Sequence, residues 1–326
     1  MADTIVYIDP GVAGGIGDGS SWINAYSSMN AACIGSEFVD FSGNDVIFLC
    51  RTLDGTKDTG GGATIQFLVN PGTIYYRGSE ALIQTYLDTT KYIQRWTDNA
   101  EGIDCNHDNF VLENIQLEPV GASADHCISI IGSDNCIIRG NLIDASGHTR
   151  SGRYGVNNQS NTNTQVYNNF FNDITSICVA FINSTNGGFY NNTFIDGGGI
   201  GVYFNAGSTG CTLRNNIINS AAANNYYFEV AKTSSNNISS DATSPDVAFR
   251  NISLTFENKG ALDFRLAAGD TEAIDAGADV SGVFTVDFFG TTRSGWSIGA
   301  HEYGAAAGGA SVGVMSKRDI HSLIMN

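Results

Sequence analysis

Four copies of one short phrase decide how this chain folds: NCIIRGNLID (135–144), NTQVYNNFFN (163–172), NGGFYNNTFID (186–196) and GCTLRNNIIN (210–219). Their alignment puts four asparagines in one column, at intervals of 28, 23 and 24 residues: Asn141, Asn169, Asn192 and Asn216. An apolar residue stands three positions before each asparagine and another two positions after it. A second alternating phrase repeats in step, as HCISI, YGVNN, ICVAF, IGVYF and YYFEV.

A repeat of about 24 residues with alternating apolar positions predicts short strands that stack coil on coil in a solenoid. Alternation favours strands over helices, because successive side chains of a strand point to opposite faces. Neighbouring coils would lie about 4.8 Å apart. Asparagine tolerates left-handed backbone in turns, and stacked asparagine amides can bond to one another. We therefore expect the asparagine column to form a ladder along the solenoid axis.

Stacked phrases of the form xNN(T/I/F)(I/F), joined by glycine-rich turns, resemble the right-handed parallel β-helix of the pectin-lyase-like fold over residues 40–245. The resemblance implies an all-β chain built as a single-stranded right-handed parallel β-helix. It implies no single activity, because this fold hosts lyases, hydrolases, adhesins and viral spikes alike.

The segment before the repeats predicts a cap. SWINAYSSMNAACIG (21–35) has the pattern of a short amphipathic helix with Ala25, Met29, Ala32 and Cys33 on one face. Together with the preceding YIDPG it resembles the opening of bacterial and phage β-helix proteins, in which a helix plugs the first coil. We therefore expect residues 1–40 to form a strand and a short N-terminal α-helical cap, and residues 41–245 to form the coils.

The sequence changes character after the repeats. LDFRLAAGDTEAIDAGADV (262–280) and VDFFGTTRSGWSIGAHEYG (286–304) resemble the terminal signature of "choice-of-anchor Q" β-helix repeat proteins. Residues 246–304 are expected to form a C-terminal β section that completes the helix. Residues 305–326 would form a small-residue linker and a docking tail, with these apolar residues at helical spacing: Ile320, Leu323 and Ile324.

The amino-acid composition excludes some classes of binding partner. The chain has 16 Lys and Arg against 33 Asp and Glu, a net charge of −17. This balance argues against nucleic acid and against an anionic membrane surface as partners. The opening MADTIVYIDP has neither a basic n-region nor an apolar h-region, so no classical signal peptide is expected. The seven cysteines include no CxxC, so they are interpreted as reduced core residues, with no metal site or cofactor.

One turn within the repeats is longer than the others. DASGHTRSGRYG (144–155) carries the densest cluster of basic residues in the chain. In an enzyme, Arg153 or His148 would act as the base, with Asp125 and neighbouring aspartates as acid or cation ligands. In a carbohydrate-binding site, Arg150, Arg153 and Tyr154 would contact the sugar. The alternative is a surface loop pinned by an ion pair between Arg153 and Asp125.

Aromatic residues outside this bulge are further candidates for sugar-stacking platforms, or for protection of the sheet surface. They are Tyr190, Tyr203, Tyr226 and Tyr227.

Phrases typical of polygalacturonase-like hydrolases (NTD, DD, GHG and RIK) do not occur in the sequence. The first hypothesis is therefore a non-enzymatic structural or surface-attachment protein, such as a phage virion decoration protein, tail fibre or spike. Its expected location is a virion or extracellular surface. Its expected partners are other virion or surface proteins, bound through the tail, and a cell-surface polysaccharide. Two alternatives stay open: a polysaccharide lyase or glycoside hydrolase acting at the 144–155 bulge, and a glycan-binding module without turnover.

Overall fold

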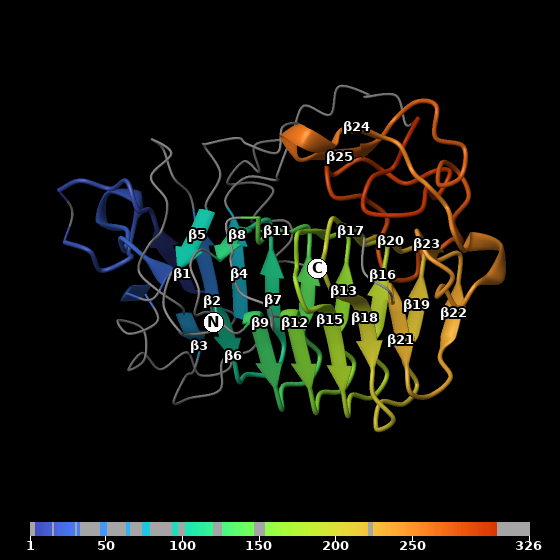
Figure 1. The fold of residues 1–326 in the computed structure, drawn as a ribbon. Helices are drawn as coiled ribbons and strands as arrows, with labels where there is room; N and C mark the ends of the chain where they lie inside the picture. The colour runs from blue at the N-terminus through green and yellow to red at the C-terminus, as the bar shows by residue number, and fades with distance from the viewer. Residues whose placement is uncertain are drawn as a thin grey trace.

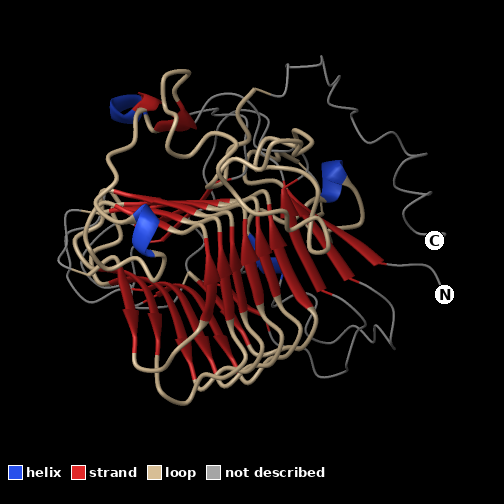
Figure 2. Ribbon diagram, turned by 90° about the vertical axis from the view of Figure 1, so that its right-hand side faces the viewer, coloured by secondary structure: helices blue, strands red, loops and turns tan. Residues whose placement is uncertain are grey.

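The chain winds into a solenoid whose three parallel β-sheets enclose a common core (Figures 1 and 2). The computed structural model describes residues 4–14, 16–29, 31–32, 46–50, 63–65, 74–78, 93–96, 102–119, 126–146, 154–220 and 224–304.

Sheet A consists, in spatial order, of β1 (Thr4–Ile8), β2 (Val46–Cys50), β4 (Ile74–Gly78), β7 (Phe110–Glu113), β10 (Ile137–Arg139), β13 (Gln165–Tyr167), β16 (Gly188–Tyr190), β19 (Thr212–Arg214) and β22 (Thr233–Ser235). Sheet B consists of β5 (Ile93–Trp96), β8 (Gln116–Pro119), β11 (Leu142–Asp144), β14 (Phe170–Asn172), β17 (Thr193–Ile195), β20 (Ile217–Asn219) and β23 (Ile238–Ser239). Sheet C consists of β3 (Ala63–Ile65), β6 (Ile103–Cys105), β9 (His126–Ile131), β12 (Tyr154–Gln159), β15 (Ile177–Ile182), β18 (Ile200–Phe204) and β21 (Tyr226–Phe228).

From β7 to β21 the chain enters sheets A, B and C in rotation and completes five coils. The strand pairs between successive coils are parallel and keep the predicted columns in register, so that Val166 pairs with Ile138 on one side and Phe189 on the other. The predicted parallel β-helix is confirmed over these strands. Each strand is too short to be stable alone, and stacking on the neighbouring coils buries its apolar face.

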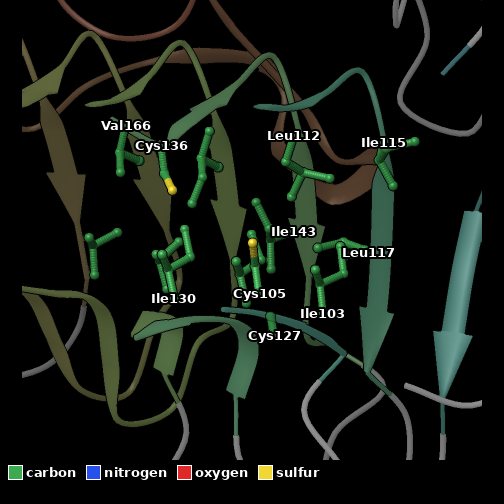
Figure 3. Close-up of a cluster of buried hydrophobic side chains, with 14 of the residues drawn as sticks. Ile103, Cys105, Leu112, Ile115, Leu117, Cys127, Ile130, Cys136, Ile143 and Val166 are labelled. Carbon is green, nitrogen blue, oxygen red and sulfur yellow. The ribbon is translucent and has the colours of Figure 1, made fainter. Parts of the chain in front are cut away.

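The core lies inside the helix, where side chains from all three sheets meet (Figure 3). Ile138, Val166, Phe189 and Leu213 contribute from sheet A, and all are buried. The six cysteines within the described residues are buried, as predicted for core residues, and each fills the space of a small apolar side chain.

The asparagine ladder is confirmed and is longer than predicted. Each Nδ2 donates to the Oδ1 of the next asparagine, from Asn141 to Asn169 (3.1 Å), to Asn192 (3.0 Å) and to Asn216 (3.2 Å). Asn216 then donates to Asn237 at 2.9 Å, and Asn237 donates to Asp246 Oδ2 at 2.8 Å. These asparagines are buried, and the ladder satisfies polar groups that would otherwise be costly to bury.

Four of the five ladder asparagines follow another asparagine, which has a different role. Asn168, Asn191, Asn215 and Asn236 have left-handed backbone, with φ values of 53°, 46°, 58° and 56°. Their side chains point outward and donate to carbonyls of the C-terminal section. In each Asn-Asn pair, therefore, the first asparagine forms the turn and the second belongs to the ladder.

The predicted N-terminal α-helical cap over residues 21–35 is not supported as a whole, because α-helical backbone within the described residues is limited to Met29, Ala31 and Ala32, where the Ala31 N–H donates to Ser28 Oγ at 3.0 Å. Trp22–Asn24 forms only a short 3-10 helix, η1, and Ala25 then becomes extended, with φ −58° and ψ 150°. Tyr26 donates its N–H to Tyr7 O and accepts the N–H of Asp9, both at 2.9 Å. Extended backbone thus satisfies the open edge of β1, where a helix would leave it unpaired. Met29 and Ala32 still join the core, whereas Cys33 lies outside the described residues.

The C-terminal section, residues 246–304, does not complete the helix as predicted. It begins with the 3-10 helix η2 (Val247–Phe249) and includes β24 (Phe256–Asn258), the 3-10 helix η3 (Lys259–Ala261) and β25 (Asp263–Leu266). β24 and β25 pair only with each other, antiparallel, and within the described residues the section adds no strand to sheets A, B or C. Figure 1 shows it (orange to red) folded back over sheet B.

The reason is the outer face of sheet B, which carries large apolar residues as the inner face does. Leu142, Phe170 and Ile195 pack there against Phe264, Phe288 and Ala300. Ile217 and Ile238 pack against Leu266, Ala273 and Ile298 of the same section. An exposed apolar face of this size is unfavourable, so the section covers it.

A buried ion pair fixes the end of this section. Arg293 donates to Glu302 Oε2 at 3.3 Å and to Asn168 Oδ1 at 2.9 Å. Glu302 accepts backbone N–H groups from residues 294 to 297. Burial lowers the pKa of Arg293 to about 10, against the opposing effect of Asp287 and Glu302. The charged residues of the terminal signature therefore hold the section onto the coils.

Candidate functional site

The basic bulge and the tail cannot be placed, because they lie outside the described residues. This applies to all of the predicted site residues except Tyr154: Asp125, His148, Arg150, Arg153, Ile320, Leu323 and Ile324. Tyr154 begins β12, where it pairs with His126 of the preceding coil and Ile177 of the following coil.

The outer face of sheet C, the sheet that contains Tyr154, is the next candidate surface. Ile128 and Ile130 point into the core, so Ser129 between them points outward. The strand register aligns one outward-pointing residue from each of six strands of sheet C in a single row. These residues are Asp104, Ser129, Asn157, Ala180, Tyr203 and Tyr227. The row is polar at one end and aromatic at the other.

The aromatic end is a stacked tyrosine pair. The rings of Tyr203 and Tyr227 lie 5.6 Å apart at 15° to each other. Tyr227 is on β21, the last strand of sheet C, and is 44% exposed. A ring at the edge of the sheet offers a flat apolar face beside polar groups, which suits the stacking of a sugar ring.

A carboxylate is fixed beside this pair. Tyr203 donates its hydroxyl proton to Glu229 Oε1 at 2.7 Å, and the Ala206 N–H donates to Glu229 Oε2 at 2.9 Å. The bond to Glu229 raises the pKa of Tyr203 to about 12. The same bond, with that from Ala206, lowers the pKa of Glu229, which therefore stays ionised near neutral pH.

Two polar groups in the middle of the row are buried without a partner. Ser129 Oγ and Asn157 Oδ1 make no hydrogen bond, although Ser129 is 1% and Asn157 5% exposed. Unpaired buried polar atoms are uncommon, and each needs an explanation such as a water or a ligand. A second ring stack flanks this part of the row, where His126 and Tyr154 lie 4.8 Å apart at 22°.

Two other tyrosines do not form platforms. Tyr226 is buried in the core, where its hydroxyl lies 3.3 Å from Asn216 O and 3.2 Å from Ile238 O. Tyr190 packs under the C-terminal section, beside Tyr167 and Phe284. The buried ring of Tyr226 cannot stack a sugar, and the partly buried ring of Tyr190 packs against the C-terminal section, in agreement with the alternative that such residues protect the sheet surface.

The aspartates near the predicted catalytic site hold turns. Asp108 Oδ1 accepts the Asp134 N–H at 2.8 Å, and Asp134 Oδ1 accepts the Thr162 N–H at 2.7 Å. The residues that the structure describes contain no group of three or more His, Cys, Asp and Glu side chains suited to a metal ion. Among the same residues, no helix is both long and apolar enough to cross a bilayer.

Comparison with known proteins agrees with the architecture. Residues 100–257 match the family model described as a right handed beta helix region. The search of curated proteins found no match. Among solved structures the chain is similar to the "Crystal structure of pectate lyase Pel9A", at 13% identity and a TM-score of 0.32. That alignment covers 93% of this chain and 97% of the other. The strand topology and the family model together define the fold as a right-handed parallel β-helix.

Proposed function

We propose that this β-helix is a rigid surface-attachment module that binds an extended glycan along the outer face of sheet C. The observation that carries the proposal is the stacked pair Tyr203 and Tyr227 with Glu229 fixed beside it. An apolar ring face next to a charged hydrogen-bond acceptor matches the two surfaces of a sugar, its C–H face and its hydroxyls. Ser129, Asn157 and Ala180 in the middle of the row are buried, so the polymer would make contact at the exposed aromatic end of the row.

Binding without turnover is favoured at this face by the state of Glu229. A general acid needs a raised pKa so that it carries a proton near neutral pH. The pKa of Glu229 is lowered instead, and its two oxygens are already bonded to Tyr203 and Ala206. We propose display on a virion or extracellular surface as the setting, in which a rigid coil stack would hold the glycan site away from its point of attachment.

The test is affinity electrophoresis of the full chain through gels that contain single polysaccharides. Wild type should be retarded by at least one of them, and Tyr227→Ala should lower its affinity at least about fivefold. Ile23→Ala is the matched control, because Ile23 is 69% exposed on η1, far along the chain from sheet C, and should behave as wild type. Reducing ends and 235-nm unsaturation are measured in parallel. Product formation by wild type that Arg153→Ala abolishes would replace this proposal with an enzyme acting at the bulge.

A further inference from the structure

The polar groups beside the stacked tyrosine pair accept hydrogen bonds. The Glu229 carboxylate only accepts, and the hydroxyl proton of Tyr203 is already donated to it. A ligand that bonds to Glu229 must therefore bring donors.

Positive charge is missing from the same strands. The described strands of sheet C contain no Lys or Arg, from β3 to β21. Lys232 follows Glu229 by three residues, but its ammonium donates to Ser208 O at 2.5 Å and lies 5.1 Å from the Phe204 ring centroid. Glu229 thus places a negative charge beside the tyrosine pair that no described basic side chain of this sheet offsets.

We infer that the site selects an uncharged, hydroxyl-rich glycan and rejects a polyuronate. This inference rests on the proposed function and adds the class of ligand to it. A sugar hydroxyl can donate to Glu229 in a charge-assisted hydrogen bond while its ring stacks on Tyr227. A uronate carboxylate in the same place would face a like charge, and like charges at close range disfavour each other.

The experiment compares two pairs of polymers by affinity electrophoresis in EDTA, which removes cations that could bridge carboxylates. The neutral pair is a linear β-glucan and a galactomannan, and the charged pair is polygalacturonate and alginate. Wild type should bind a neutral polymer and neither charged one. Glu229→Gln should weaken neutral binding about tenfold, because a charge-assisted bond is replaced by a neutral one. Glu229→Lys should admit a polyuronate.

The outcomes separate the two claims. Binding of a polyuronate by wild type that depends on Tyr227, without binding of a neutral polymer, overturns the inference and leaves the proposed function intact. Failure of every polymer to bind in a Tyr227-dependent way overturns both. Glu229 is exposed, so its variants should melt at the wild-type temperature, which confirms that a loss of binding is local.

Discussion

Asp246 terminates the asparagine ladder by accepting two hydrogen bonds from Asn237 on a single oxygen. The backbone N–H of Asn237 lies 2.9 Å from Asp246 Oδ2, and its Nδ2 lies 2.8 Å from the same atom. Asp246 Oδ1 also accepts from Ser234 Oγ at 3.1 Å. The last coil therefore has an acceptor where the next asparagine would otherwise be, and a carboxylate suits this position because both groups that face it are donors.

Removal of this acceptor should destabilise the end of the helix. Asp246→Ala leaves the Asn237 N–H unpaired and removes one of the three acceptors of Asn237 Nδ2, so we expect a loss of about 1–3 kcal/mol in the free energy of unfolding. Urea denaturation followed by circular dichroism measures it. Asp246→Asn keeps an acceptor and should lose less, while Asp279→Ala, which removes only an exposed bond from the Ser281 N–H, should lose less than about 1 kcal/mol. Equal stability of Asp246→Ala and wild type would contradict the role of Asp246 as the terminus.

A change in the middle of the ladder should cost more. Asn192 accepts from the backbone and side chain of Asn169 and donates to Val166 O, Tyr190 O and Asn216 Oδ1. Asn192→Ala should lower the free energy of unfolding by about 3–5 kcal/mol, because it leaves several buried groups unpaired. The matched control is Asn224→Ala, at an exposed position. A loss below about 1 kcal/mol for Asn192→Ala would show that water replaces the ladder.

The packing of the C-terminal section on sheet B can be tested at one ring pair. Phe288 lies 4.7 Å from Phe170 in an edge-to-face contact, and both are buried. Phe288→Ala should cost about 3–5 kcal/mol and should expose the outer face of sheet B to a hydrophobic dye. Val283→Ala, in the same section but 42% exposed, is the control. Unchanged dye binding in Phe288→Ala would contradict a cover held by this contact.

His301 makes the stability of the C-terminal section depend on pH. Its Nδ1 accepts the Leu266 N–H at 3.0 Å. Burial, and then Arg265 and Arg293, lower the pKa of His301 from 6.5 to about 4. The unfolded chain therefore binds a proton more readily, so this stability is fully present above pH 6.5 and is lost as the pH falls toward 4.

The size of this effect follows from the shift in pKa. We expect about 3 kcal/mol less stability at pH 4 than at pH 7 from this group alone. Urea unfolding of wild type and His301→Asn across this range measures it. Asparagine keeps an acceptor but does not titrate, so its curve should be flatter in that window. Parallel curves for the two proteins would contradict the assignment to His301.

The repeats could be predicted because each coil repeats the same physical requirements. Asn141, Asn169, Asn192 and Asn216 share one environment, so their alignment fixed the register of sheets A and B. Asn114 precedes the ladder column by one residue, in the place of the turn asparagine. In the structure it has left-handed backbone, with φ 57°, and Ile115 occupies the first position of the ladder column, where its N–H donates to Asn141 Oδ1.

The cover of sheet B was missed, although the sequence contains its signal. Strands buried on both faces read as continuous apolar runs. Leu142–Ile143, Phe170–Phe171 and Ile217–Ile218 are such pairs, in which only one member can point into the core. In the proposed glycan site, Tyr203 and Tyr227 were already candidates for sugar stacking, whereas Glu229 was missed because it meets Tyr203 across 26 residues of sequence.

The outward asparagines have a consequence for how this protein can change in length. A repeat protein ordinarily tolerates the gain or loss of a unit, because each unit contacts only its neighbours. Here one continuous section binds four successive coils at once, through Asn168 to Val286 O, Asn191 to Gly299 O, Asn215 to Ala278 O and Asn236 to Ala276 O. A coil inserted among them would displace these partners by about 4.8 Å, too far for a hydrogen bond. The C-terminal section is thus a molecular ruler that fixes the number of coils beneath it.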